Sequence, residues 1–264
     1  MQIKRYLHIW LQWLKISLGR ESIFRGNAWV RLLGQALWLG TALVFFETLF
    51  LHVPSIGGWK RGQVWLLIAV NELAQQLYRM SVGGGIGRIP NLIWQGKLDG
   101  VLTKPISPLF NVAVSRMRPY DAPALLLPLA LGWYAMRALN LHPTPAQWLW
   151  FGMLLAVGIA ARFAITLSAV SLAFWLTRIY ALPALLSEMF NLSGYPEGIF
   201  RGAARALFTF GVPVLVIANF PTAVLLGWPA LPRLAAGALA VGGWGALAAA
   251  AWRYGLRHYT AVGG

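Results

Sequence analysis

The chain has 264 residues, of which 58% are hydrophobic and only 11% are charged, whereas soluble domains carry about 25% charged residues. So apolar a composition excludes an ordinary soluble protein, and we interpret residues 1–264 as one all-α integral membrane domain. The net charge is +15, but the cations flank apolar blocks instead of gathering on one solvated face, which argues against nucleic-acid binding.

The N-terminal segment, residues 1–26, has the pattern of an amphipathic helix that lies in the membrane interface. Its apolar side recurs at helical spacing and consists of Ile3, Tyr6, Leu7, Trp10, Trp13, Leu14 and Leu18. The opposite side carries Lys4, Arg5, His8, Gln12 and Lys15. Such a helix serves either as an anchor or as a lever that passes motion from a cytoplasmic partner to the first span.

Five apolar blocks are long enough to cross a bilayer, which takes roughly 20 residues. We predict that they form spans over residues 28–51, 63–82, 112–136, 148–176 and 234–252.

The stretch from 179 to 232 is too long for one straight span and too apolar for a soluble loop, and six prolines interrupt it. One arrangement places a short span at 179–194, followed by a hairpin over 196–230 that re-enters the membrane. The other places a cytoplasmic segment first and the span at 207–227. Irregular backbone at membrane depth survives only where protein or a water-filled cavity surrounds it.

Basic residues set the orientation of the chain. In the hairpin arrangement, 15 of the 22 Lys and Arg residues lie on the side of both termini, six lie opposite, and Arg162 falls within a span. The positive-inside rule therefore predicts cytoplasmic termini. The alternative arrangement moves Arg201 and Arg205 inside and increases the bias, so charge alone favours it.

The loop between the second and third spans, residues 83–110, has 28 residues, although a bare connection needs only a few. We predict a short helix over Asn91–Thr103, bounded by Pro90 and Lys104-Pro105. It would show apolar and charged side chains together, which is typical of a docking surface and also of a second interfacial helix. These side chains are Leu92, Ile93, Leu98, Leu102, Lys97 and Asp99.

The same loop does not encode a nucleotide site. A phosphate-binding loop requires Gly-x4-Gly-Lys-Ser/Thr, but Leu98 follows Gly96-Lys97 and Asn91 stands where the first glycine belongs. The four histidines lack metal-ligand spacing, and the absence of cysteine excludes thiolate ligands and a cysteine nucleophile. We therefore predict no catalytic residue, metal site or cofactor in this chain.

Polar residues at membrane depth form a second group of candidates, because an ionised group there is costly unless it is paired or hydrated. The second span carries a polar face of Asn71, Glu72, Gln75 and Gln76. Arg162 could pair with Glu72 or Glu188, and Glu47 lies near the end of the first span. These residues either hold helices together or line a pathway for a substrate or proton.

Several of these segments resemble one family. The stretch IWQGKLDGVLTKPISPLF, in which Gly, Leu-Asp, a basic residue-Pro and a second Pro recur, is similar to a signature of bacterial ABC-transporter permeases of the type-2, exporter-like superfamily. Tyr195-Pro196, Phe210-Gly211-Val212-Pro213 and Asn219-Phe220-Pro221 resemble the second signature of this group. The ending YGLRHYTAVGG is also similar, so the resemblance covers essentially the whole chain.

The resemblance implies a six-span fold with an N-terminal interface helix, a coupling helix between spans two and three and a re-entrant hairpin before span six. For this reason we adopt the hairpin arrangement, with Tyr195, Pro196, Pro213 and Pro221 in the hairpin. It also implies that two permeases, identical or related, pair in the bacterial inner membrane on two cytoplasmic ATPase subunits, which bind ATP and Mg²⁺. The segment that couples to the ATPase would comprise Gly96, Lys97, Leu98, Asp99, Leu102, Lys104 and Pro105.

Two other classes of protein remain as alternatives. An ion-coupled secondary transporter would need intramembrane ion sites and usually internal repeats, and the chain has a few charges and no evident repeat. A membrane scaffold would need no polar face on the second span.

Overall fold

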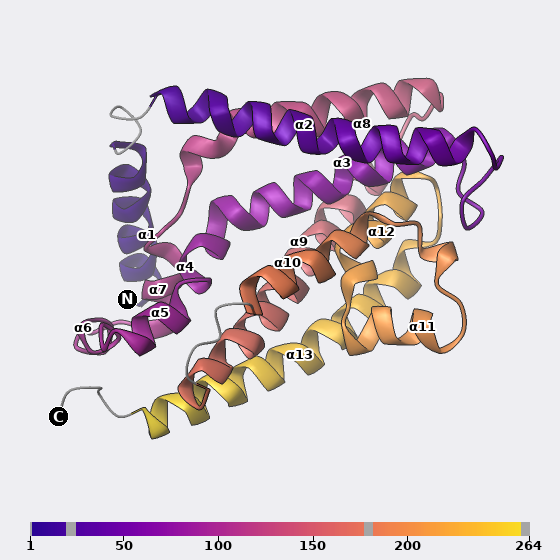
Figure 1. The fold of residues 1–264 in the computed structure, drawn as a ribbon. Coiled ribbons are helices and arrows are strands. Elements are labelled where there is room, and N and C mark those ends of the chain that lie inside the picture. The colour runs from indigo at the N-terminus through magenta and orange to yellow at the C-terminus, as the bar shows by residue number, and fades with distance from the viewer. Residues whose placement is uncertain (1, 20–24, 177–181, 260–264) are drawn as a thin grey trace.

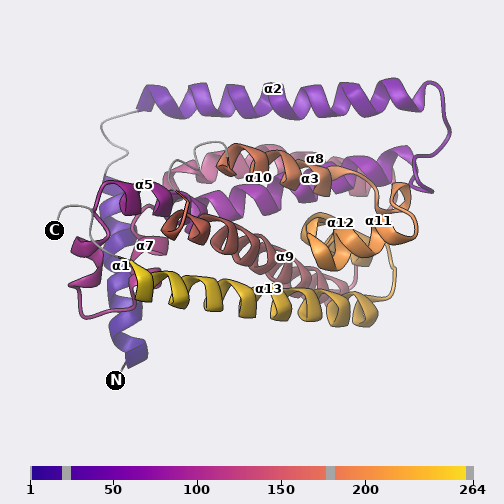
Figure 2. The ribbon, with the colours of Figure 1, turned by 60° about the horizontal axis from the view of Figure 1, so that its bottom comes forward.

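The computed structural model describes residues 2–19, 25–176 and 182–259, and every regular element in these ranges is helical. The parts of the expected interface helix at residues 1 and 20–24, and of the expected fifth span at 179–181, lie outside the described residues. The long helices run side by side as a bundle, and α1 (Gln2–Gly19) stands across one end of it (Figures 1 and 2).

Among residues 2–19, 25–176 and 182–259, three helices are long and apolar enough to cross a membrane by themselves. They lie in Trp29–Phe50 of α2 (Arg25–Phe50), in Pro145–Phe174, which comprises α9 (Pro145–Ser171) and a 3₁₀ turn, and in α13 (Ala230–His258). A fourth candidate is a bent pair, Ala203–Gly211 with Val214–Leu225, whose two halves meet at 97°. Six spans therefore stay a prediction.

The centre of the bundle is built on α3 (Arg61–Tyr78), α9 and α12 (Val214–Leu225). Every residue of α12 is buried, which a helix can achieve only when other elements surround it. Small residues allow the close approach, because a side chain on Gly158 of α9 would meet the backbone of Ile217 at 2.8 Å. By contrast, α2 lies on the flank of the bundle, with most of its large apolar side chains exposed (Figure 2).

The region expected as one span over 112–136 contains a break. Helix α7 (Pro108–Val114) ends near Ser115, and a 3₁₀ segment (Pro119–Leu125) then leads into α8 (Leu126–Ala138). Proline disfavours helical backbone in the residue before it, and Arg118, which precedes Pro119, leaves the helical region and donates its N–H to the Met80 carbonyl at 2.9 Å. Hydropathy alone could not reveal this break.

The loop over 83–110 is also divided. A π-helical turn (Arg79–Gly83) and α4 (Gly84–Ile86) extend α3, and α5 (Ile89–Trp94) and α6 (Asp99–Leu102) follow. The single helix predicted over Asn91–Thr103 is thus wrong, because Gly96 adopts a φ of 65° and ends the first of two short helices.

Both described ends of the chain lie at the same end of the bundle as α5, α6 and α7 (Figure 1). At the opposite end, the α2–α3 connection meets the start of the segment that contains α11 (Ala203–Ala206) and α12. Gly57 and Gly198 touch there so closely that a Cβ on Gly198 would lie 1.8 Å from the Gly57 carbonyl oxygen.

The segment from 197 to 227 leaves this far end and returns to it. Gly198 lies against Gly57, and Gln147 at the start of α9 donates to the Val224 carbonyl at 3.3 Å. Between these points, the Phe210 carbonyl accepts a hydrogen bond of 3.0 Å from Trp244, in the middle of α13. The turn between the two halves of the bent pair therefore lies halfway along the bundle.

Candidate functional site

The polar face predicted on the second span is present on α3. Asn71, Glu72, Gln75 and Gln76 are each buried, and their spacing places them on one side of the helix. Gln76 donates to the Asp121 carbonyl at 3.1 Å and accepts two hydrogen bonds from Arg79, while Asn71 accepts one from the Ser193 hydroxyl.

A cavity of about 450 Å³, the polar chamber, lies beside this face, between α2, α3, the 3₁₀ segment Pro119–Leu125 and α10 (Leu182–Asn191). The Asp121 carboxylate forms ion pairs with two arginines that line the chamber, Arg31 at 3.0 Å and Arg118 at 2.9 Å. The charged side chains that line the chamber are balanced in number: Arg31, Arg79, Arg118, Glu72, Asp121 and Glu188.

A second cavity of about 280 Å³, the aromatic chamber, lies farther from the end that holds the chain termini. Phe45 and Phe46 of α2 and Tyr195 form one wall, with ring centroids 5.2 to 6.3 Å apart. Within the described part of the chain, its charged lining residues are Glu72 and Glu188, and none is basic. The two chambers adjoin, because both are lined by Trp38, Glu72, Glu188 and Asn191.

Arg162 on α9 does not form the ion pair considered for it. The ion pairs among the described residues include neither Glu72 nor Glu188. The guanidinium instead lies 4.8 Å from the ring centroid of Tyr78 and 4.4 Å from that of Phe190. Its Nε and Nη1 atoms are buried without a hydrogen-bond partner. Pairing of distant spans depends on their packing, which the sequence did not reveal.

The segment expected to couple to a partner packs on the bundle through Leu98 and, in part, through Val101. Leu98 is fully buried at 0% exposure and packs in a cluster with residues of α4, α7 and α9, so the prediction that it would be displayed is wrong. Around it the surface carries exposed groups of both charges and two apolar side chains. These exposed residues are Lys97, Asp99, Leu102, Lys104 and Pro105.

One described end of the chain contacts this segment, and the other contacts the start of α7, directly after it. The Tyr6 hydroxyl of α1 accepts a hydrogen bond from the Ser107 N–H at 3.3 Å, and its ring meets Phe110 edge-on at 4.9 Å. After α13, burial, together with the charge and hydrogen bonding of Asp99, raises the pKa of Tyr259. Tyr6 and Tyr259 therefore flank the segment from α1 and α13.

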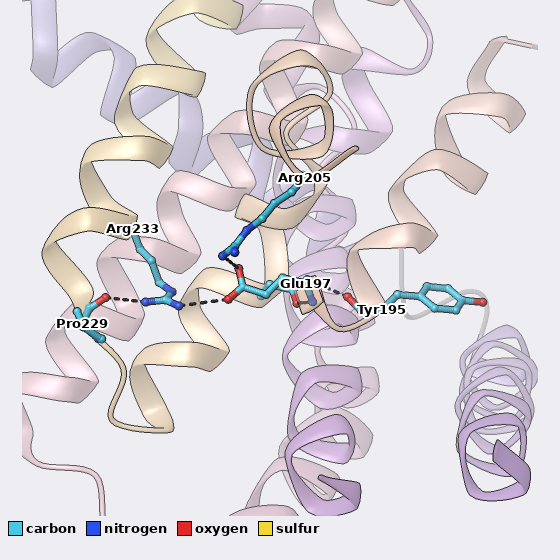
Figure 3. Close-up of polar contacts among 6 residues, drawn as sticks. Tyr195, Glu197, Arg205, Pro229 and Arg233 are labelled. Atoms are coloured by element: carbon cyan, nitrogen blue, oxygen red, sulfur yellow. Dashed lines mark hydrogen bonds and ion pairs between the residues drawn. The ribbon is translucent and has the colours of Figure 1, made fainter. Parts of the chain in front are cut away.

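A compact polar network holds the returning segment at the other end. Glu197 is buried, and its carboxylate lies between Arg205 at 3.3 Å and Arg233 at 3.2 Å, while Arg233 also donates to the Pro229 carbonyl (Figure 3). Asn219, at 0% exposure, accepts from the Glu197 N–H at 2.7 Å.

Proline marks the ends and the turn of this segment. Tyr195-Pro196 leads into it in extended backbone, and Pro213 stands at the turn, immediately before α12. Pro221 lies inside α12, where it has no N–H to donate to the helix.

Asp121 and Glu197 were not among the sequence predictions, and Asn219 was named only as part of the Asn219-Phe220-Pro221 motif. A signal existed for two of them, since Asp121 and Glu197 are acids within stretches rich in arginine and proline. Neither signal identifies a partner. Among the described residues, no group of three His, Asp or Glu side chains is placed to hold a metal ion.

The profile of a family described as ABC-2 family transporter protein matches residues 36–263, which is most of the chain. No curated protein and no solved structure matches the chain.

Proposed function

The chain belongs to the ABC-2 family of transporter proteins, and on this premise we propose that it is the permease subunit of an ATP-binding-cassette exporter. In this proposal it forms the translocation pathway as a dimer, with an identical or related permease. Separate cytoplasmic ATPase subunits bind ATP and Mg²⁺ and drive it.

The observation that carries the proposal is the coupling segment at the end of the bundle. Its surface presents Lys97, Asp99 and Lys104 to the outside, while the buried Leu98 side chain fixes it to the helices behind. A mobile loop could not transmit force, but a segment packed into the core can. We therefore propose that residues 96–105 fit a groove of the ATPase and pass its motion to the spans.

The distribution of charge supports a cytoplasmic position for this end. The coupling segment carries the exposed Lys97 and Lys104, and both described ends of the chain lie at the same end of the bundle (Figure 1). Of the six Lys and Arg residues predicted at the opposite end, three are paired with an acid: Arg61 with Glu47, and Arg205 and Arg233 with Glu197. This pairing reduces the positive charge that faces outward. This asymmetry agrees with the positive-inside rule.

The two chambers are the proposed pathway. The polar chamber lies toward the cytoplasmic end and the aromatic chamber lies farther out, so a substrate would pass from the first to the second. We place the polar face of α3 and Glu188 on this route, and we assign Arg162 to helix packing. The returning segment over 196–230 is the proposed re-entrant hairpin, because its ends lie at the outer end and its turn lies level with Trp244.

The mechanism follows from this arrangement. ATP binding draws the two ATPase subunits together and displaces the two coupling segments. The displacement passes through the Leu98 cluster to α4, α7 and α9, and the permease dimer then changes from inward to outward access. Hydrolysis resets the ATPase and with it the segment.

The test exchanges the charges of the coupling segment by Lys97→Glu combined with Asp99→Lys, in a permease co-expressed with its ATPase. Both side chains are exposed, so we expect the permease to unfold within about 2 °C of wild type. Like charges brought together at an interface cost several kcal/mol, so we expect at least about tenfold less ATPase to co-purify.

The matched control is Lys60→Glu, which changes an exposed charge at the other end of the bundle and should leave the complex intact. Normal assembly and transport by the double variant would show that the docking assignment is wrong. Pumping on an ion gradient by the purified chain alone, without nucleotide hydrolysis, would instead favour the secondary-transporter class.

A further inference from the structure

We infer that the aromatic chamber is a binding site for an amphiphilic organic cation. This inference rests on the proposed transport function and names the class of substrate that the pathway takes. It depends on three observations: two acids line the chamber, one of them (Glu72) is buried, and aromatic side chains form a wall of the same chamber.

The charges of the aromatic chamber have one sign. Glu72 and Glu188 line it, and among the residues that the structure describes no Lys, Arg or His does. Neither acid takes part in any ion pair among the residues that the structure describes. Glu188 accepts one hydrogen bond of 3.1 Å, from Asn191. The nearest arginines line the adjoining polar chamber or lie behind Glu72 on α9, so a cation bound in the aromatic chamber would add positive charge on the side where these acids have none.

Glu72 is the more informative of the two acids, because its exposure is only 4%. Arg79 and Arg162 contribute positive potential at Glu72, but neither forms an ion pair with it, and the Trp38 indole lies within hydrogen-bonding reach. In the polar chamber, Arg31 and Arg118 are already committed to Asp121, and Arg79 donates to Gln76.

The aromatic wall supplies the second part of cation recognition. Phe45, Phe46 and Tyr195 face the chamber, and Trp38 lies where the two chambers meet. Aromatic faces attract a cation within about 6 Å, and they also accept the apolar part of an amphiphile. An anion would meet two carboxylates here and no base, so the same lining rejects it.

The size of the site limits the ligand. A volume of about 280 Å³ lies at the lower edge of the ~300–1,000 Å³ range of ligand pockets, and the adjoining polar chamber can hold the remainder of a longer molecule. The chemistry fits a monovalent cation with one or a few aromatic rings. A hydrated metal ion would gain nothing from the aromatic wall.

The test measures binding of ethidium, a fluorescent and permanently charged aromatic cation, to the purified permease by fluorescence anisotropy in a nonionic detergent. We expect saturable binding that weakens about tenfold in Glu188→Gln and more in Glu72→Gln combined with Glu188→Gln, because each change removes one charge next to the cation. Phe45→Leu keeps the apolar volume and should weaken binding about threefold.

Glu47→Gln is the matched control. It removes one acid from the same helix as Phe45, but outside both chambers, where Glu47 pairs with Arg61. Binding should be unchanged in this variant. Glu188 is exposed, so its variant is expected to fold, and thermal unfolding of each protein checks this.

Three results would overturn the inference. The first is no saturable ethidium binding, and the second is ethidium binding by the double variant as tight as that of the wild type. The third is competition by the aromatic anion 8-anilinonaphthalene-1-sulfonate with an affinity equal to that of ethidium. None of these measurements involves the ATPase. A failure here therefore leaves the coupling test standing, and a failure of the coupling test leaves the binding result standing.

Discussion

The side chain of Asn219 holds together the backbone at the start of the returning segment. Its amide nitrogen donates to the carbonyls of Ser193 at 3.0 Å and Tyr195 at 3.1 Å, and its oxygen accepts from the Glu197 N–H at 2.7 Å. The residue is fully buried, so water cannot replace these contacts. Replacement by leucine preserves the approximate size and removes all three hydrogen bonds.

The number of hydrogen bonds that are lost sets the expected loss of stability in Asn219→Leu. Each buried backbone group that loses its partner costs about 1–3 kcal/mol, so three such groups cost about 3 kcal/mol even at the lower limit. For a chain of this size, 1 kcal/mol corresponds to about 2–4 °C in Tm, so Asn219→Leu should lower the Tm by about 6–12 °C. Thermal unfolding in mild detergent, followed by intrinsic tryptophan fluorescence, measures this change.

Thr222→Val is the control on the same helix. Thr222 is equally buried, but its hydroxyl donates only to the Ala218 carbonyl of its own helix, which keeps its backbone partner. We expect this variant to lose less than about 1 kcal/mol. A Tm of Asn219→Leu within 2 °C of wild type would refute the assignment of the three hydrogen bonds, and with it the placement of α12 against the segment.

Two further substitutions test the packing of the bundle by the same measurement. Arg162→Met should leave the Tm unchanged or raise it by about 2–4 °C, because it replaces a buried guanidinium whose Nε and Nη1 atoms have no hydrogen-bond partner. A marked fall in Tm would mean that Arg162 gains a partner in the assembled protein. Gly85→Ala should destabilise the protein by about 1–3 kcal/mol, because the new Cβ would lie 2.1 Å from the Val112 carbonyl oxygen. The control, Gly100→Ala, places a Cβ that meets nothing within 4 Å and should be tolerated. Equal stability of the two variants would contradict the close packing of α4 on α7.

The family and the polar face of the second span could be predicted from the sequence. Motif spacing around Gly96–Pro105 carried the resemblance, which the family match over residues 36–263 confirms. The face of Asn71, Glu72, Gln75 and Gln76 could be read from helical periodicity because all four lie on one element. Local patterns of this kind do not depend on how distant elements pack.

What the sequence did not predict depends on tertiary structure. Pro119 disfavours helix at Arg118, but the hydrogen bond from Arg118 to Met80 depends on packing, and the partners of Arg162 are rings on α3 and α10. Leu98 looked like a displayed side chain because its neighbours are polar, but it fills a gap among α4, α7 and α9. In each case the deciding atoms belong to another part of the chain.

The contact between Gly57 and Gly198 changes what can be expected of two surface loops. Loops normally accept substitutions readily, yet neither position has room for a methyl group, and Gly57 also has a φ of 57°. In a saturation mutagenesis experiment, these two positions should be as intolerant as the interior of the bundle. Any outward opening must either carry both loops as one body or separate the two glycines.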